Sequence, residues 1–170
     1  MATTVRDHRL AWMLAGLCAG LALSYLWPVE EARAVATDRE ERFAIATTET
    51  GPGLAESVFV LDFLTGRMYG ATLNQQANPP IFTNFYARNV AADFGIDGSS
   101  KPKFVMIPGR ADAVASGRGS TVSTGVLYVG ELNSGKVVCY RFSHRISRTP
   151  LPVVPLEPVA FFPFREATTE

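Results

Sequence analysis

Residues 58–69, Val-Phe-Val-Leu-Asp-Phe-Leu-Thr-Gly-Arg-Met-Tyr, decide the fold that we predict for this chain of 170 residues. β-Branched and aromatic residues dominate both ends of the stretch, which favours two β-strands. Thr65-Gly66 marks a tight turn between them, so the stretch is predicted to form a β-hairpin. We expect Gly66 to take the left-handed backbone conformation and the Asp62 carboxylate to accept hydrogen bonds from the turn amides.

A diverged second copy of this pattern lies at residues 127–138, Leu-Tyr-Val-Gly-Glu-Leu-Asn-Ser-Gly-Lys-Val-Val. Aligning Gly135 with Gly66 places Glu131 at the position of Asp62. Gly135 is therefore also expected to be left-handed, and Glu131 is expected to bind the amides of its own turn. The sequence predicts two hairpins of one design.

An isolated apolar stretch precedes each hairpin, at residues 43–47 and 104–107. We therefore predict an all-β, mainly antiparallel domain over residues 43–147, made of two repeated strand-plus-hairpin units. Asp62 and Glu131 could instead form a functional carboxylate pair, but their equivalent turn positions favour a structural role.

The two hairpins resemble the outer strands of β-propeller blades of the PQQ-binding type, in which strand–Asp-x-x-Thr-Gly–strand recurs. This resemblance implies the hairpin geometry and no cofactor, because two units cannot close a propeller of 4–8 four-stranded blades. The whole chain also resembles uncharacterised small signal-anchored proteins of bacterial envelopes. That second resemblance implies no activity.

An uncharged apolar run over residues 10–27 follows a short basic leader, residues 1–9. A helix of this length rises about 27 Å, close to the hydrocarbon thickness of a bilayer, and so predicts a transmembrane signal-anchor with the lipid bilayer as a partner. Arginines precede the run and glutamates follow it, which places the N-terminus in the cytoplasm and the β domain outside. Residues 28–42 are predicted to form a linker.

Several residues of this run have a predicted role in the span. They are Leu10 and Trp27 at its ends, Trp12 near the headgroups, and Gly16, Gly20 and Ser24 along one side. Small residues at that spacing form a groove for a second helix, although they are also common in membrane helices generally. Small residues around Ala34 and Ala36 leave a cleaved secretory signal as the alternative.

The composition excludes some partners. The chain has 16 basic and 16 acidic residues, so it has no electrostatic footprint for nucleic acid. Cys18 lies in the predicted span and Cys139 in the β domain, so they are not expected to form a disulfide.

Residues 148–170 form a proline-rich apolar tail, in which the proline density favours an extended path. Phe161, Phe162 and Phe164 make its end too apolar to lie in water without a partner. Packing on its own domain is favoured over docking on another protein. The docking alternative predicts a protein partner, and the groove of small residues in the span predicts a homo-dimer. No small-molecule partner is indicated.

No catalytic, cofactor-binding or metal-binding site is predicted. Residues 130–136 have the spacing of a phosphate-binding loop, but Val137 follows where Ser or Thr is needed and a strand replaces the helix. Residues 100–103 match Ser-x-x-Lys, but Pro102 opposes a helix there. His144 is the only histidine beyond the N-terminal leader, and with Cys139 it cannot supply a zinc site.

Two functions are weighed. The favoured one is a non-enzymatic structural or protein-interaction domain held by a single membrane helix. The alternative is a secreted small-ligand-binding or hydrolytic domain, released by cleavage near Ala34 or Ala36, that uses polar groups near the turns. These groups are Asp62, Glu131, Asn133 and His144. Their convergence on a concave pocket would favour the alternative.

Overall fold

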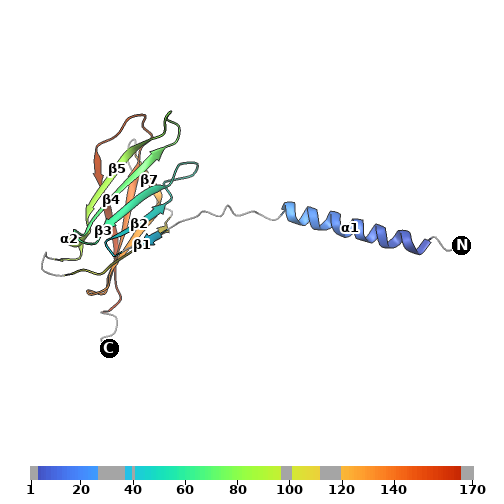
Figure 1. Ribbon diagram of the computed structural model, residues 1–170, viewed down its shortest axis with the longest axis horizontal. Coiled ribbons are helices and arrows are strands. Elements are labelled where there is room, and N and C mark those ends of the chain that lie inside the picture. Colours follow the sequence, from blue (N-terminus) through green and yellow to red (C-terminus); the bar gives the residue numbers. More distant parts are fainter. Residues whose placement is uncertain (1–3, 27–36, 40, 97–100, 112–119, 166–170) are drawn as a thin grey trace. The chain divides into compact units, whose positions relative to one another are not determined.

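The computed structural model describes the chain except residues 1–3, 27–36, 40, 97–100, 112–119 and 166–170, which are drawn in grey in Figure 1. It divides into two compact units, Met1–Ala34 and Val35–Glu170. The leader residues 1–3, Trp27, most of the predicted linker and the cleavage sites at Ala34 and Ala36 lie outside the described residues.

The first unit contains one helix, α1 (Thr4–Leu26). Within the part of the chain that the structure describes, no helix is long and apolar enough to cross a membrane. Side chains are described over residues 11–22, where alanine and glycine alternate with larger apolar residues.

This finding corrects three predictions. The transmembrane span over residues 10–27 is wrong, and so are the signal-anchor and the single-pass membrane localisation with a cytoplasmic N-terminus. The predicted fold class, all-β preceded by one transmembrane helix, is also wrong, since the described residues form two β-sheets and two helices, neither of which could span a membrane. Among the predicted span residues, Trp12 is exposed, and Cβ atoms added at Gly16 and Gly20 would meet nothing within 4 Å. The side chains of Leu10 and Ser24 lie outside the described residues.

The second unit is mostly β-sheet. Sheet A has six strands in the order β1-β2-β3-β4-β5-β9. They are β1 (Thr37–Arg39), β2 (Phe43–Thr48), β3 (Ser57–Asp62), β4 (Arg67–Asn74), β5 (Ile81–Asn89) and β9 (Val153–Pro155). The first five strands pair antiparallel in sequence order, and β9 pairs parallel with β5. The short helix α2 (Val90–Asp93) follows β5.

Sheet B has four antiparallel strands in the order β10-β8-β7-β6. They are β6 (Phe104–Arg110), β7 (Thr121–Glu131), β8 (Lys136–His144) and β10 (Glu157–Pro163). Each sheet therefore contains one lone strand followed by one hairpin of the repeated pattern: β2 with β3–β4 in sheet A, and β6 with β7–β8 in sheet B.

The core lies between the two sheets. Alternate positions on the strands are buried, as the burial of Phe59 and Leu61 on β3 and of Val138 and Tyr140 on β8 shows. Aromatic rings join the two layers, because the ring centroid of Phe142 on β8 lies 4.9 Å from that of Phe59 and 5.2 Å from that of Tyr86 on β5. Such aromatic pairs stabilise beyond their buried area.

The C-terminal segment joins both sheets. β9 extends sheet A and β10 extends sheet B, and Leu156 between them is fully buried. The tail therefore packs on its own domain through backbone pairing and this one leucine. Its aromatic side chains do not share that burial, since Phe161 and Phe162 are each 62% exposed and Phe164 is 37% exposed.

Candidate functional site

The turn between β3 and β4 holds its carboxylate internally. Asp62 accepts hydrogen bonds from the Thr65 hydroxyl at 2.7 Å and from the Leu64 amide at 2.9 Å. The Thr65 hydroxyl, together with the turn amides, lowers the pKa of Asp62 against a small desolvation effect. Gly66 has a φ of 62°, the left-handed conformation that closes this turn. The Asp62 carboxylate therefore stabilises its own loop.

In the turn between β7 and β8, the carboxylate of Glu131 also binds a residue outside the turn. Glu131 is only 2% exposed, and its Oε1 accepts from the amides of Lys103 at 3.0 Å and Asn133 at 3.1 Å. Its Oε2 accepts from the Ser134 amide at 2.6 Å. Desolvation raises the pKa of Glu131, but these hydrogen bonds outweigh it and the net pKa is lowered. Gly135 has a φ of 70°.

These carboxylates leave little capacity for chemistry. Both carboxylates are ionised, and their oxygens accept hydrogen bonds from neighbouring groups. Neither is therefore suited to act as a general acid near neutral pH. Asn133 is likewise engaged, since its Nδ2 donates to the Lys101 carbonyl at 3.1 Å. The structure gives all three a local stabilising role.

His144 lies at the end of β8, while Glu131 and Asn133 lie before its first residue, Lys136. The four polar groups considered above therefore do not converge on one pocket. His144 is 7% exposed, and its Nδ1 has no hydrogen-bond partner among the described residues. Burial lowers the pKa of its imidazole, which favours the neutral form.

The cavity beside His144 is small. It measures about 50 Å³ and is lined by apolar side chains such as Leu54 and Ile146 and by polar ones such as Thr83 and Asn84. A buried water needs roughly 10–15 Å³, so the cavity has room for a few waters and not for an organic substrate. Among the described residues, no group of three or more His, Cys, Asp or Glu side chains could hold a metal ion.

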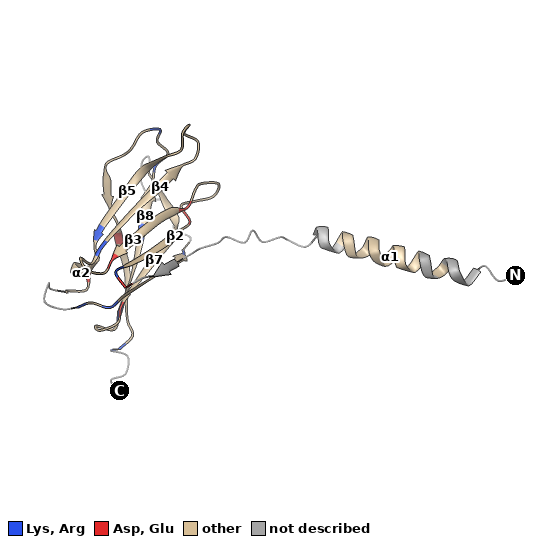
Figure 2. Ribbon diagram, viewed as in Figure 1, with Lys and Arg blue, Asp and Glu red and all other residues tan. Residues whose placement is uncertain are grey.

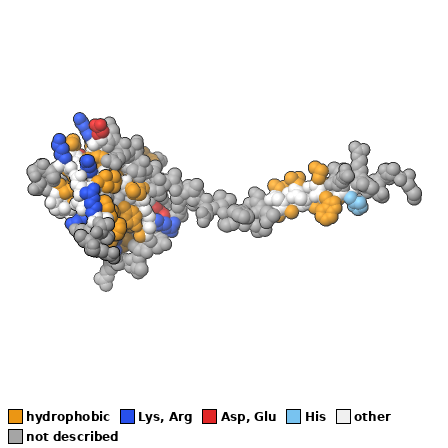
Figure 3. Space-filling view, turned by 90° about the horizontal axis from the view of Figure 1, so that it is seen from below, with side chains coloured by type: hydrophobic (Ala, Val, Ile, Leu, Met, Phe, Trp, Pro, Cys, Tyr) orange, Lys and Arg blue, Asp and Glu red, His pale blue; other side chains and the backbone are white. Residues whose placement is uncertain are grey.

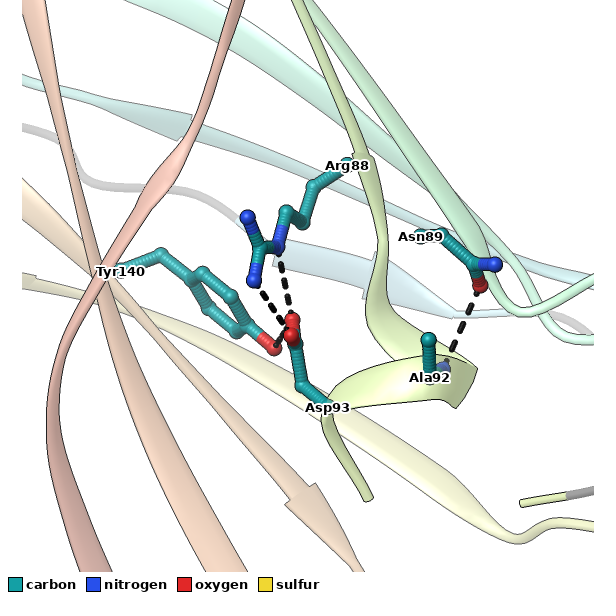
Figure 4. A network of polar contacts seen from close by, with 5 residues as sticks. All are labelled: Arg88, Asn89, Ala92, Asp93 and Tyr140. Carbon is teal, nitrogen blue, oxygen red and sulfur yellow. Dashed lines mark hydrogen bonds and ion pairs between the residues drawn. The ribbon is translucent and has the colours of Figure 1, made fainter. Parts of the chain in front are cut away.

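One polar network was not predicted from the sequence. Asp93 on α2 accepts hydrogen bonds from Arg88 Nε at 2.8 Å, from Arg88 Nη2 and from the Tyr140 hydroxyl at 2.8 Å (Figure 4). Burial raises the pKa of Tyr140. The three residues come from β5, α2 and β8, so the network connects α2 to sheet B. The carboxylate is saturated with donors, which makes this a structural contact.

The sequence carries a local signal for the start of α2, but none for the contact between Asp93 and Tyr140. Asn89 precedes α2, and its Oδ1 accepts from the Ala92 amide at 3.3 Å as an N-cap (Figure 4). The cap predicts a helix start, but it does not reveal that Asp93 meets Tyr140, which lies 47 positions further along the chain.

Sheet B also carries apolar residues on the side that faces away from the core. We define the outer face of sheet B by two rows across its four strands. The rows are Val105, Gly130, Val137 and Phe162, and Ile107, Tyr128, Cys139 and Ala160. Ile107 is 60% exposed and Tyr128 is 39% exposed. When one face of an antiparallel sheet is in contact with water, the side chains on that face are usually polar. The side chains of these two rows are apolar.

Charged residues are sparse along the strands. Figure 2 shows that most of the strand ribbon is free of Lys, Arg, Asp and Glu, and Figure 3 shows one face of the molecule on which hydrophobic side chains lie among Lys and Arg side chains. Cys139 is half-buried within the outer face, and desolvation raises the pKa of its thiol. A protonated thiol is a poor nucleophile, so Cys139 serves here as an apolar residue.

The edges of the two sheets differ in how they are covered. β1 and β9 are three residues each, and β6 lies against sheet A, where the Thr48 hydroxyl donates to the Gly109 carbonyl at 3.2 Å. β10 is seven residues long, and β8 is the strand on which it pairs. Its exposed residues 159–162 carry no charge.

We call residues 159–164, the exposed part of β10 and the residue that follows it, the β10 edge. It continues the outer face of sheet B through Ala160 and Phe162. A long uncharged edge strand is a template for pairing with another strand, and most proteins protect such edges with charges or covering segments. The prolines at positions 158 and 163 limit the length of this edge without covering it.

The chain matches no family model, no curated protein and no solved structure.

Proposed function

We propose that the unit Val35–Glu170 is a protein-interaction domain that binds its partner along the β10 edge and the adjoining outer face of sheet B. The observation that carries the proposal is the exposure of Phe161 and Phe162, each 62%, within the uncharged residues 159–162 of an edge strand. Large apolar patches that stay exposed mark interaction sites in folded proteins.

The β10 edge has the features that strand addition uses. Backbone donors and acceptors along an unpaired edge supply the hydrogen bonds, and alternate side chains of the added strand supply specificity. Here Phe161 lies on the side of Val138 and Phe162 on the side of Val137, so an added strand meets one aromatic ring on each face. Fully burying such rings contributes about 1.5–3 kcal/mol each.

The positions of Asp62, Glu131 and His144 favour an interaction domain over a catalytic one. Asp62 and Glu131 are held by their turns, and His144 borders a cavity of about 50 Å³. None of these three side chains belongs to the two rows of the outer face of sheet B. The exposed features of the domain are apolar and extended, which suits a polypeptide partner.

Site-specific photo-crosslinking tests the proposal. A photoreactive phenylalanine analogue replaces Phe162 in the full chain, and the same analogue replaces Leu64 in a matched control. Leu64 is 74% exposed on the β3–β4 turn, far from β10 in sheet topology. Irradiation in cells should give a protein adduct from position 162 and none from position 64. Equal adducts from both positions, or none from either, would contradict the proposal.

A further inference from the structure

We infer that a second cavity, between the edge of sheet A and the end of β8, binds a small organic monocarboxylate through Arg145. This cavity measures about 220 Å³. It shares no residue with the β10 edge, so the inference does not depend on the proposed function. The residues that line it include three apolar ones, two serines and one arginine: Phe85, Leu151, Val154, Ser120, Ser143 and Arg145.

The path of the tail leaves this cavity between the sheets. β10 pairs with β8 only as far as Arg141, and beyond it Ser143 and His144 pair with β7 alone. The preceding part of the tail belongs to sheet A, where Val153 of β9 pairs with Phe85 of β5. The cavity therefore lies where the last residues of β8 have no β10 partner and the tail has not yet joined sheet B.

A β-bulge in β5 shapes the wall beside the cavity. Thr72 pairs with Asn84 and Leu73 pairs with Phe82, so Thr83 is an extra residue on β5. The bulge makes the consecutive residues Thr83 and Asn84 both buried, 2% and 7% exposed, where regular alternation would expose one of them. Bulges redirect side chains in this way and are frequent beside functional sites.

The redirected residues hold both ends of the connection from Arg145 to Leu151. Asn84 Oδ1 accepts from the Arg145 amide at 3.0 Å, and Asn84 Nδ2 donates to the Arg145 carbonyl at 3.0 Å. The Leu151 amide donates to the Thr83 carbonyl at 2.7 Å. The backbone of two lining residues is thus fixed before any ligand binds, which reduces the entropy that binding costs.

The charge of the cavity selects an anion. Arg145 is exposed, and its guanidinium has no hydrogen-bond or ion-pair partner among the described residues, whereas the guanidinium groups of Arg88 and Arg141 pair with Asp93 and Glu157. None of the described residues that line the cavity is acidic. Guanidinium binds a carboxylate through two parallel hydrogen bonds. One positive charge balances a monocarboxylate but not a phosphate group, whose charge is about −1.5 to −2.

The size of the cavity limits the apolar part of the ligand. An apolar cavity of about 150 Å³ binds one benzene molecule, so a volume of about 220 Å³ has room for a group of that size with a carboxylate. Drug-sized ligands need about 300–1,000 Å³. Arg145 also borders the cavity of about 50 Å³ beside His144, but that cavity has room only for waters. Benzoate is therefore a suitable probe.

A titration of the isotope-labelled full chain tests the inference, with benzoate as the probe and benzamide as its neutral counterpart of equal size. Benzoate should shift the amide resonances of Ser143, Arg145 and Leu151 and saturate with a dissociation constant of about 1 mM or below. Benzamide should bind at least about tenfold more weakly, because it lacks the charge. The absence of saturable shifts at these residues, or equal binding of the two probes, would overturn the inference.

A pair of arginine variants tests the role of Arg145. Arg145→Gln should weaken benzoate binding about tenfold. Arg148→Gln is the matched control, because Arg148 is an exposed arginine of the same connection that does not line the cavity, and it should bind benzoate as the unsubstituted chain does. Unchanged binding by Arg145→Gln, or an equal loss in both variants, would overturn the inference. The comparison of benzoate with benzamide uses the unsubstituted chain and does not depend on the folding of either variant.

Discussion

The turns of the two hairpins have nearly the same backbone and very different surroundings. In both turns the glycine amide donates to the carbonyl of the acidic residue, at 2.8 Å from Gly66 to Asp62 and 3.0 Å from Gly135 to Glu131. Asp62 binds only groups of its own turn, in exposed positions. Glu131 is buried and also binds the amide of Lys103, which directly precedes β6.

The two copies of the repeated turn differ in what their acidic residue contacts, and only the second copy binds another part of the chain. One additional methylene and a buried position let Glu131 reach a neighbouring strand, whereas Asp62 cannot extend beyond its loop. The first turn is a self-contained reversal of the chain. The second is also a junction that positions the lone strand of its unit. Substitutions at the two acidic residues should therefore have unequal effects.

The largest effect is expected for Glu131→Ala. It removes the acceptor for three backbone amides in a buried position, and a buried donor left unpaired costs about 1–3 kcal/mol. We expect a loss of about 2–4 kcal/mol in the free energy of unfolding, measured by urea denaturation of the full chain. Asp62→Ala is the matched control and should lose no more than about 1 kcal/mol. Equal losses would show that the junction role of Glu131 is wrong.

The two turn glycines should also differ. A Cβ at Gly66 would lie 2.5 Å from the Cβ of Ala91, a helix residue that packs against the core. A Cβ at Gly135 would lie 2.6 Å from the Cβ and the Cδ of Arg165, an exposed residue after β10 whose displacement disturbs less packing. Both positions have positive φ, which alone costs an alanine about 1 kcal/mol. Gly66→Ala should therefore destabilise by about 2 kcal/mol and Gly135→Ala by about 1 kcal/mol.

Thermal unfolding of the two alanine variants measures this difference. Ala91→Gly provides the control, because in combination with Gly66→Ala it removes the Cβ clash and leaves only the cost of positive φ. The double variant should be less stable than Ala91→Gly by only the cost of the positive φ, about 1 kcal/mol. A Gly135 variant that is less stable than the Gly66 variant would contradict the packing around α2.

The pH dependence of stability should follow Glu131. Its pKa in the folded state is lowered from the ordinary value of 4.5, so the unfolded chain binds more protons in the acidic range. The stabilisation that it provides is present above that value and is lost as the pH falls through the folded-state pKa. The melting temperature of Glu131→Gln should therefore vary less with pH below 4.5 than that of the unsubstituted chain. Parallel curves would show that the charge of Glu131 adds nothing.

The smallest effect is expected for Asp62→Asn. Asparagine keeps an oxygen acceptor for the amides of Leu64 and Thr65, and these bonds are exposed. We expect a change of about 0.5 kcal/mol or less in the free energy of unfolding. A loss as large as that of Glu131→Ala would remove the contrast between the two turns.

Sequence reasoning reached the parts of the fold that depend on neighbours in the chain. The strands of both hairpins follow from runs of β-branched and aromatic residues, and the positive φ of Gly66 and Gly135 follows from the turn chemistry. The transmembrane span over residues 10–27 was wrong, because the prediction rested on the length of an uncharged run that contains much alanine and glycine. The apolar residues between the hairpin units, such as Phe85, Tyr86, Val90 and Phe94, fit neither helical nor strand periodicity, and this segment forms both β5 and α2.

The sequence by itself determined the strands, the turns and the apolar character of the tail, because these depend on interactions between residues a few positions apart. Only the tertiary structure decided that Arg88 and Tyr140 meet at Asp93, that Glu131 is buried while Asp62 is half-buried, and that the tail divides between two sheets. It also decided that Leu156 enters the core while Phe161 and Phe162 stay at the surface. The physical reason is that strand order and sheet packing choose which side chains lose water, and side-chain type alone does not encode that choice.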